Sequence, residues 1–213
     1  MLAKVLSSAV FGIDAYVVEV EVDIAHGLPS FSTVGLPDVA VRESKDRVKA
    51  AIKNSGYEFP PDRITVNLAP ADIKKEGASF DLPIALGILA ATGTVEQTRL
   101  DAFLILGELS LYGEVKPIKG TLPVSIAARE KGLLGVIIPR GNANEAAVVS
   151  EIEVLPVGRL SEVVGFLNGE RSIPRAQIDL DQIFRSDFDY GVDFVDVRGQ
   201  HRNHDWPPRR LYT

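Results

Sequence analysis

Several residue types and patterns are scarce or absent in this sequence of 213 residues. It contains no cysteine, which excludes disulfides, thiolate zinc sites and cysteine nucleophiles and suits a cytoplasmic protein. Three histidines occur, His26, His201 and His204, and because they are scattered no metal site is predicted. No G-x-x-x-x-G-K-[ST] phosphate loop is present. These absences exclude several catalytic classes before any motif is considered.

Long apolar runs are also missing. The longest, from Leu82 to Ala91, is about half of the roughly 20 residues that a membrane span needs, so no membrane partner is expected. The start of the chain, MLAKVLSSAVFGIDAYVVEV, runs directly into an alternating pattern and is interpreted as mature structure, not a signal peptide. A net charge of −6 argues against a generally basic nucleic-acid-binding surface, although it leaves room for a local patch.

The first third of the sequence predicts a small sheet and one helix. Apolar residues alternate with polar ones over 16–24, which is typical of a strand with one buried face. Residues 2–11 are its expected hairpin partner, followed by strands over 31–34 and 64–68. Between these strands, residues 38–55 have the period of an amphipathic helix.

The next hundred residues predict alternating helices and strands. Residues 79–92 are apolar on nearly all sides, which predicts a helix buried in the middle of a layered domain. Strands are expected near 103–108, 113–117, 135–138 and 151–157, and helices over 122–131, 144–149 and 161–167. This alternation indicates crossover units on a sheet, and therefore an α/β fold. The composition changes after Gly169, so we expect one domain over 1–169.

Three long stretches resemble a known family. They are VFGIDAYVVEVEVDIAHGLPSFSTVGLPDVAVRESKDRVKAAI, NLAPADIKKEGASFDLPIAL and LGELSLYGEVKPIKG, and they are similar to the N-terminal domain of the ComM/YifB, or magnesium-chelatase-like, family. A more distant resemblance is to the protease domain of Lon. The resemblance implies a Lon-protease-like fold, also described as ribosomal protein S5 domain 2-like, that normally precedes an ATPase of the AAA+ class.

The family resemblance also implies a role for the rest of the chain. Residues 170–200 are interpreted as a linker toward a missing AAA+ module, since VDFVDVRGQ at 192–200 resembles the entry to such a module. ATP and Mg are expected to serve that absent module, and no cofactor is expected in this chain. Full-length members are expected to be hexamers. The tail, 201–213, does not match the family and is expected to be disordered.

Ser79 is the candidate nucleophile that the resemblance to Lon suggests. KEGASFD at 75–81 aligns with the segment that carries Lon's serine, but the position of Lon's catalytic lysine falls on Val124, which cannot accept a proton. Nothing in the sequence suggests burial that would lower the pKa of Lys74 or Lys75. The favoured interpretation makes Ser79 the N-cap of the buried helix, with Asp81 complementing the positive helix end. No catalytic residue is therefore assigned.

Charged residues give a second candidate site. Lys74, Lys75, Lys116 and Lys119 are candidate DNA contacts, although solvated loop lysines are the favoured interpretation. A further group of charges is predicted to form the water-facing side of the first helix: Glu43, Lys45, Asp46, Arg47 and Lys49.

The hypothesis that follows is a non-enzymatic N-terminal domain of a ComM/YifB-type ATPase. The resemblance implies DNA branch migration in natural transformation, with this domain serving assembly or engagement of DNA or another substrate. Two alternatives remain: a Lon-type Ser–Lys peptidase that uses Ser79, and a stand-alone nucleic-acid-binding domain.

Overall fold

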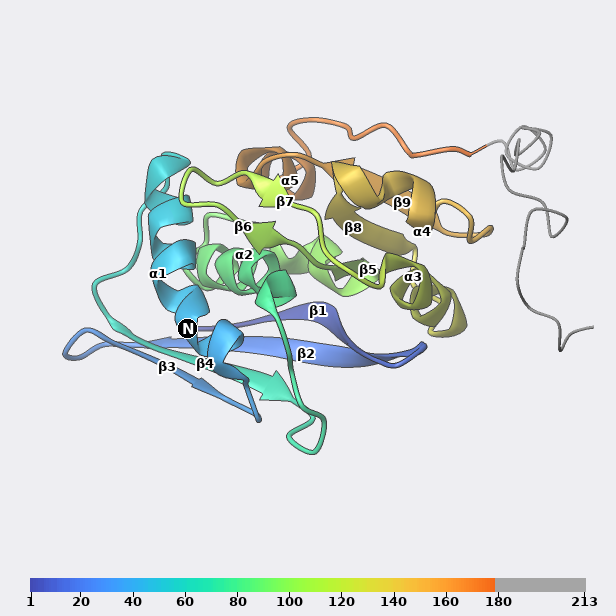
Figure 1. Cartoon of the computed structure of the whole chain (residues 1–213). Helices are drawn as coiled ribbons and strands as arrows, with labels where there is room; N and C mark the ends of the chain where they lie inside the picture. The colour runs from blue at the N-terminus through green and yellow to red at the C-terminus, as the bar shows by residue number, and fades with distance from the viewer. Residues whose placement is uncertain (179–213) are drawn as a thin grey trace, which may run out of the picture. The chain divides into compact units, whose positions relative to one another are not determined.

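The computed structural model describes residues 1–178, which form a mixed α/β unit (Figure 1). The tail, 201–213, and most of the predicted linker, 179–200, lie outside the described residues. The first part of that linker, 170–178, is described: the Ala176 amide donates to the Val154 carbonyl at 2.8 Å, and Ile173 packs on the main core. No helix in residues 1–178 has the length and apolar character to cross a membrane.

Four strands form the first sheet: β1 (Leu2–Phe11), β2 (Asp14–Ala25), β3 (Ser30–Val34) and β4 (Arg63–Ala69). Their order is β1-β2-β4-β3, with β3 parallel to β4 and the other two pairs antiparallel. The predicted hairpin is confirmed, with Phe11 opposite Asp14 at its tip. The predicted alternation is confirmed over 18–24, because Val18, Val20, Val22 and Ile24 face the core, whereas Tyr16, expected on the same face, is exposed.

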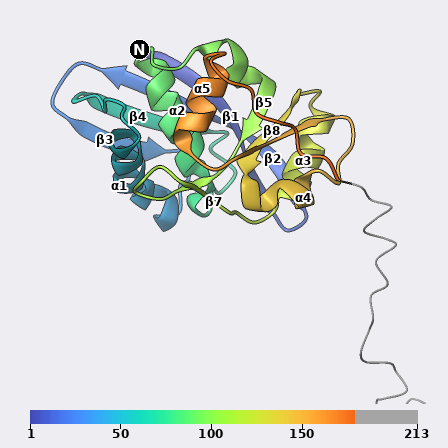
Figure 2. The same cartoon turned by 90° about the horizontal axis from the view of Figure 1, so that it is seen from above.

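Two helices pack behind this sheet, α1 (Val39–Asn54) and α2 (Asp81–Ala91). The predicted inner face of α1 is confirmed, and every residue of α2 is buried. Helix α2 lies against β1 and β2 (Figures 1 and 2). Gly87 permits this approach, because a Cβ atom there would lie 2.6 Å from Cγ2 of Val22.

The second half forms a parallel sheet of β5 (Phe103–Ile105), β8 (Gly135–Pro139) and β9 (Glu153–Val157), in that order. Its connections contain α3 (Thr121–Glu130), α4 (Ala143–Ala146) and, after β9, α5 (Leu160–Leu167). The predicted crossover pattern is therefore confirmed.

The strand expected over 103–108 is divided in two. After β5, Gly107 leaves the ladder and its amide donates to the Ser79 carbonyl at 2.9 Å. A Cβ atom at this position would lie 2.6 Å from Cγ1 of Val115, so the close passage of the chain needs a glycine. The chain then enters β6 (Glu108–Leu109), which pairs with β7 (Val115–Lys116).

Candidate functional site

The stretch around Ser79 and the turn before α3 meet in the largest cleft described, with a volume of about 730 Å³. The cleft lies between the end of β1, the loop that leads to α2, and the turn at 117–120. Its polar lining comes from separate parts of the sequence: Ser8, Asp38, Glu76, Ser79, Glu108 and Lys119. The Ser79 segment that the Lon resemblance singles out and the 117–120 turn are thus neighbours in space.

Ser79 is not the helix cap that the sequence predicts. It lies in a 3-10 turn, Ala78–Phe80, and neither that turn nor α2 receives a side-chain cap. Backbone hydrogen bonds replace it: the Leu82 amide donates to the Gly107 carbonyl at 3.0 Å, while the Gly107 amide donates to the Ser79 carbonyl. The passing chain at Gly107 therefore satisfies the start of α2, and the half-buried Ser79 lines the cleft.

Val124, to which the resemblance assigns the position of Lon's lysine, contributes nothing to this cleft. Val124 is 0% exposed and belongs to the core beneath the second sheet, together with Leu104 and Val136. It does not line the cleft that contains Ser79. An aliphatic side chain in an apolar core cannot accept the serine proton.

Lys75 differs most from its prediction. Its side chain is 0% exposed, and burial lowers the pKa of its amine, contrary to the expectation of a solvated lysine. The amine does not approach the cleft but donates to the Pro70 carbonyl. Its backbone also bridges to α1, because the Lys75 amide donates to Leu36 and its carbonyl accepts from Asp38. Lys75 is therefore a structural residue and has no surface for contact with DNA.

The other candidate lysines are exposed, as predicted. Lys74 pairs with Glu76 at 2.5 Å, and Lys116 pairs with Glu114 at 2.6 Å. These exposed ion pairs offset part of the positive charge, and Lys75 is buried, so the four candidate lysines do not form a continuous cationic surface; the favoured interpretation of Lys74, Lys116 and Lys119 as solvated loop lysines agrees with their exposure. Lys119 is the lysine of this group that lines the cleft with Ser79.

The turn that carries Lys119 is held in place by hydrogen bonds from one buried side chain. The buried Asn142 side chain accepts a hydrogen bond from the Ile118 amide at 3.0 Å and donates to the Ile118 carbonyl at 2.7 Å. Lys119 itself is exposed and is not enclosed by the protein. Among the described residues, the cleft thus contains a serine, an exposed lysine and three carboxylates, but no enclosed lysine of the Lon kind.

Sequence reasoning missed an ion pair that connects α1 to the start of α2. Arg47, predicted to face water, donates from Nε to Oδ2 of Asp81 at 2.7 Å and from its terminal nitrogen to Oδ1 at 3.1 Å. Asp81 is 0% exposed. A carboxylate inside a helix that is apolar on all sides needs a partner, and this was the available signal.

Asp38 is a second missed residue. One carboxylate oxygen caps α1 by accepting from the Val41 amide at 2.8 Å, and the other accepts from the Gly77 amide at 3.0 Å. A single side chain therefore connects the start of α1 to the loop that carries Ser79. The signal was an aspartate directly before a helical period.

Comparisons with known proteins agree with this geometry. The family model described as subunit ChlI of Mg-chelatase matches residues 20–142. The chain is 42% identical over 200 residues to the competence protein ComM of Haemophilus influenzae, and 37% identical over 201 residues to the protein YifB of Escherichia coli. These alignments cover 93% and 94% of the chain but 39% of each relative, so the chain spans about two fifths of their length. A weaker similarity, 28% identity over 161 residues, covers 70% of the chain and 19% of the Lon protease of Chloroflexus aurantiacus.

Proposed function

Because the chain belongs to the magnesium-chelatase-like family that includes the ComM and YifB proteins, we propose that it is the non-catalytic N-terminal domain of an AAA+ ATPase of this type. The full-length protein would carry the ATP- and Mg-dependent module after this domain, assemble as a hexamer and act on DNA in the cytoplasm. Branch migration during natural transformation is the proposed process, and the name of the Haemophilus relative, a competence protein, supports it.

The proposed fold is the one that Lon's protease domain shares with ribosomal protein S5 domain 2. Two features support this assignment: the similarity to Lon, and the fully buried α2 that crosses β1 and β2. In this fold the serine cleft would have been retained as a surface, and its hydrolytic chemistry lost.

The observation that carries the non-catalytic assignment is that, within residues 1–178, no enclosed lysine of the Lon kind lines the cleft with Ser79. Val124 is enclosed in the core, the Lys75 amine is bound to Pro70, and Lys119 is exposed. A serine hydroxyl without an adjacent base is a weak nucleophile. The cleft is therefore assigned to assembly or to engagement of a substrate that passes to the ATPase module.

A serine-reactive fluorophosphonate tests this assignment directly. The chain and its Ser79→Ala variant are incubated with the probe alongside trypsin as a positive control, and hydrolysis of casein is followed in parallel. We expect the two chains to react equally weakly and to leave casein intact.

One observation favours a second candidate, the Ser–Lys peptidase: Lys119 and Ser79 line the same cleft. Labelling that is strong in the natural chain, and lost in both Ser79→Ala and Lys119→Met, would overturn the non-catalytic assignment in its favour. Labelling lost in Ser79→Ala alone would also contradict the assignment and would require a different base.

A further inference from the structure

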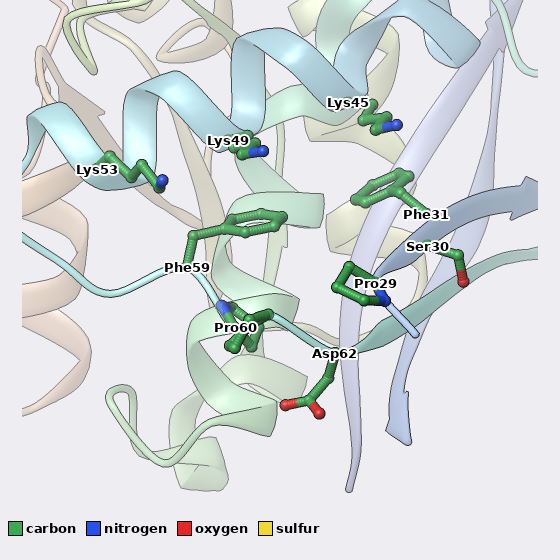
Figure 3. A pocket seen from close by; sticks show the side chains of 10 residues that line it. Pro29, Ser30, Phe31, Lys45, Lys49, Lys53, Phe59, Pro60 and Asp62 are labelled. Atoms are coloured by element: carbon green, nitrogen blue, oxygen red, sulfur yellow. The ribbon is translucent and has the colours of Figure 1, made fainter. Parts of the chain in front are cut away.

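The outer face of α1 carries a row of lysines that no part of the serine cleft uses. Lys45, Lys49 and Lys53 follow one another at every fourth residue, so they project from one side of the helix (Figure 3). With a rise of about 1.5 Å per residue, their attachment points are about 6 Å apart and span about 12 Å. All three side chains are exposed.

A pocket of about 330 Å³ lies beside this row. Phe31 enters it from β3 and Phe59 from the segment before β4, and both rings are half-buried (Figure 3). The Lys49 amine lies 5.8 Å from the centre of the Phe59 ring. Three prolines complete the apolar lining: Pro29, Pro60 and Pro61.

The charge of this site differs from that of the chain as a whole. The chain has a net charge of −6, yet three of the residues that line this pocket are lysines and one is an acid. That acid, Asp62, lies 3.3 Å from Nδ1 of His26. The site is thus a local cationic surface with aromatic walls.

Some lysines of the described residues form ion pairs, but those of this row do not. Within residues 1–178, Lys4, Lys74 and Lys116 each form an ion pair with a carboxylate, whereas none involves the three lysines of this row. Like charges four residues apart destabilise a helix, and within residues 1–178 no carboxylate forms an ion pair with these three lysines. An anionic ligand would compensate all three at once.

We propose that this lysine row and its pocket bind single-stranded nucleic acid, with phosphates against the lysines and a base against Phe59 or Phe31. Single-strand sites combine a positive track for the backbone with aromatic rings on which unpaired bases stack. A row of three cations suits successive phosphates of one strand better than the single phosphate of a small ligand. The inference rests on the proposed function, since it locates the engagement of DNA on α1 and not at the serine cleft.

Binding of a fluorescein-labelled oligothymidylate to the whole chain, followed by anisotropy, tests the proposal. With three phosphate contacts and a salt slope of about −0.7 for each, we expect affinity to fall about 20-fold between about 50 and about 200 mM salt. The triple variant Lys45→Gln/Lys49→Gln/Lys53→Gln should lose this salt dependence and most of the affinity. Phe59→Leu, which keeps an apolar side chain but removes the ring, should weaken binding about tenfold with the salt slope unchanged.

The matched control removes the same amount of charge elsewhere. Lys74→Gln/Lys116→Gln/Lys119→Gln should bind the strand within about twofold of the natural chain, and circular dichroism checks that all variants are folded. If the control loses binding and the α1 variant keeps it, the location on α1 is wrong while engagement of DNA by this domain stands. If the natural chain does not bind the strand at low salt, both the location and engagement of DNA fail, whereas the fluorophosphonate result on Ser79 is unaffected.

Free thymidine monophosphate separates a strand site from a nucleotide site. We expect it to compete only at concentrations far above those of the strand, because it supplies a single phosphate. Competition at equal concentration would overturn the strand proposal and identify a nucleotide pocket.

Discussion

Replacement of Arg47 by methionine probes the buried ion pair that connects α1 to α2. The natural guanidinium forms two hydrogen bonds with Asp81 and donates to the Ala40 carbonyl at 3.0 Å. Methionine keeps much of the apolar stem but removes every donor. In the variant, Asp81 would keep one hydrogen bond, which its Oδ2 atom accepts from the Leu109 amide at 3.2 Å.

The magnitude follows from the burial of the carboxylate. Asp81 is 0% exposed, and removal of one partner of a buried ion pair costs about 3–5 kcal/mol because the remaining charge is uncompensated. The Arg47 side chain is 25% exposed, so water screens the pair in part and we expect the lower end, about 3 kcal/mol. This is a large share of the free energy of unfolding of an ordinary domain.

The effect should depend on pH in a defined direction. Burial raises the pKa of Asp81, and Arg47 opposes that rise, so the variant should have an even higher value. A carboxyl whose pKa is higher in the folded state than in the unfolded state contributes stability when the pH is below its unfolded-state pKa of about 3.9. That contribution is lost as the pH rises through its folded-state pKa. The deficit of Arg47→Met should therefore be largest near pH 7 and shrink as the pH falls toward 4.

Urea unfolding, followed by far-ultraviolet circular dichroism at several pH values, measures this deficit. Arg42→Met, an exposed arginine on the same helix, is the control and should change stability by less than about 0.5 kcal/mol. The double variant Arg47→Met/Asp81→Asn should be more stable than the sum of the single effects predicts. A deficit below about 1 kcal/mol, or one that stays constant with pH, would refute an ionised Asp81 in this pair.

Three further substitutions test other contacts of the fold. Gly87→Ala should destabilise the chain by about 1–3 kcal/mol, because its Cβ atom would lie 2.6 Å from Val22. Adding Val22→Ala should relieve that clash, so urea unfolding of the double variant should show less destabilisation than the sum of the single effects. Strictly additive effects would contradict the clash. Lys75→Met should become less stable relative to the natural chain as the pH rises from 7 toward 10, because a lysine with a lowered pKa stabilises the fold only as it loses its proton. Urea midpoints of the two chains that change with pH in parallel would rule this out. Asn142→Ala should lower the free energy of unfolding by about 1–3 kcal/mol, because the two hydrogen bonds to Ile118 are lost. It should also increase amide hydrogen exchange in the 117–120 turn, and unchanged exchange would show that Asn142 does not hold that turn.

Much of the fold could be predicted from periodicity alone. The alternation over 16–24 identified the buried face of β2, and the 3.6-residue period of 38–55 identified the inner face of α1. These patterns succeed because a strand or a helix repeats its geometry at a constant interval, so burial is recorded in the local order of residues. The resemblance to Lon was also enough to direct attention to Ser79 and to Val124.

The candidate site depended on contacts between distant segments, which no local pattern records. Lys75 and Arg47 look like surface charges in the sequence. In the structure Lys75 is buried and its amine donates to the Pro70 carbonyl, and Arg47 binds the buried Asp81. Ser79 has the residue type of a helix cap, yet the chain at Gly107 satisfies the start of α2 instead.

The sequence by itself therefore determined most of the elements and their buried faces, and the resemblance to Lon assigned the lysine position to Val124. The tertiary structure alone decided which charges are buried, that Ser79 lines a cleft, and that Phe31 and Phe59 lie beside the lysines of α1. The physical reason is that burial of a charge, and capping by a distant backbone, are free energies of the assembled chain, set by neighbours that are far apart in sequence.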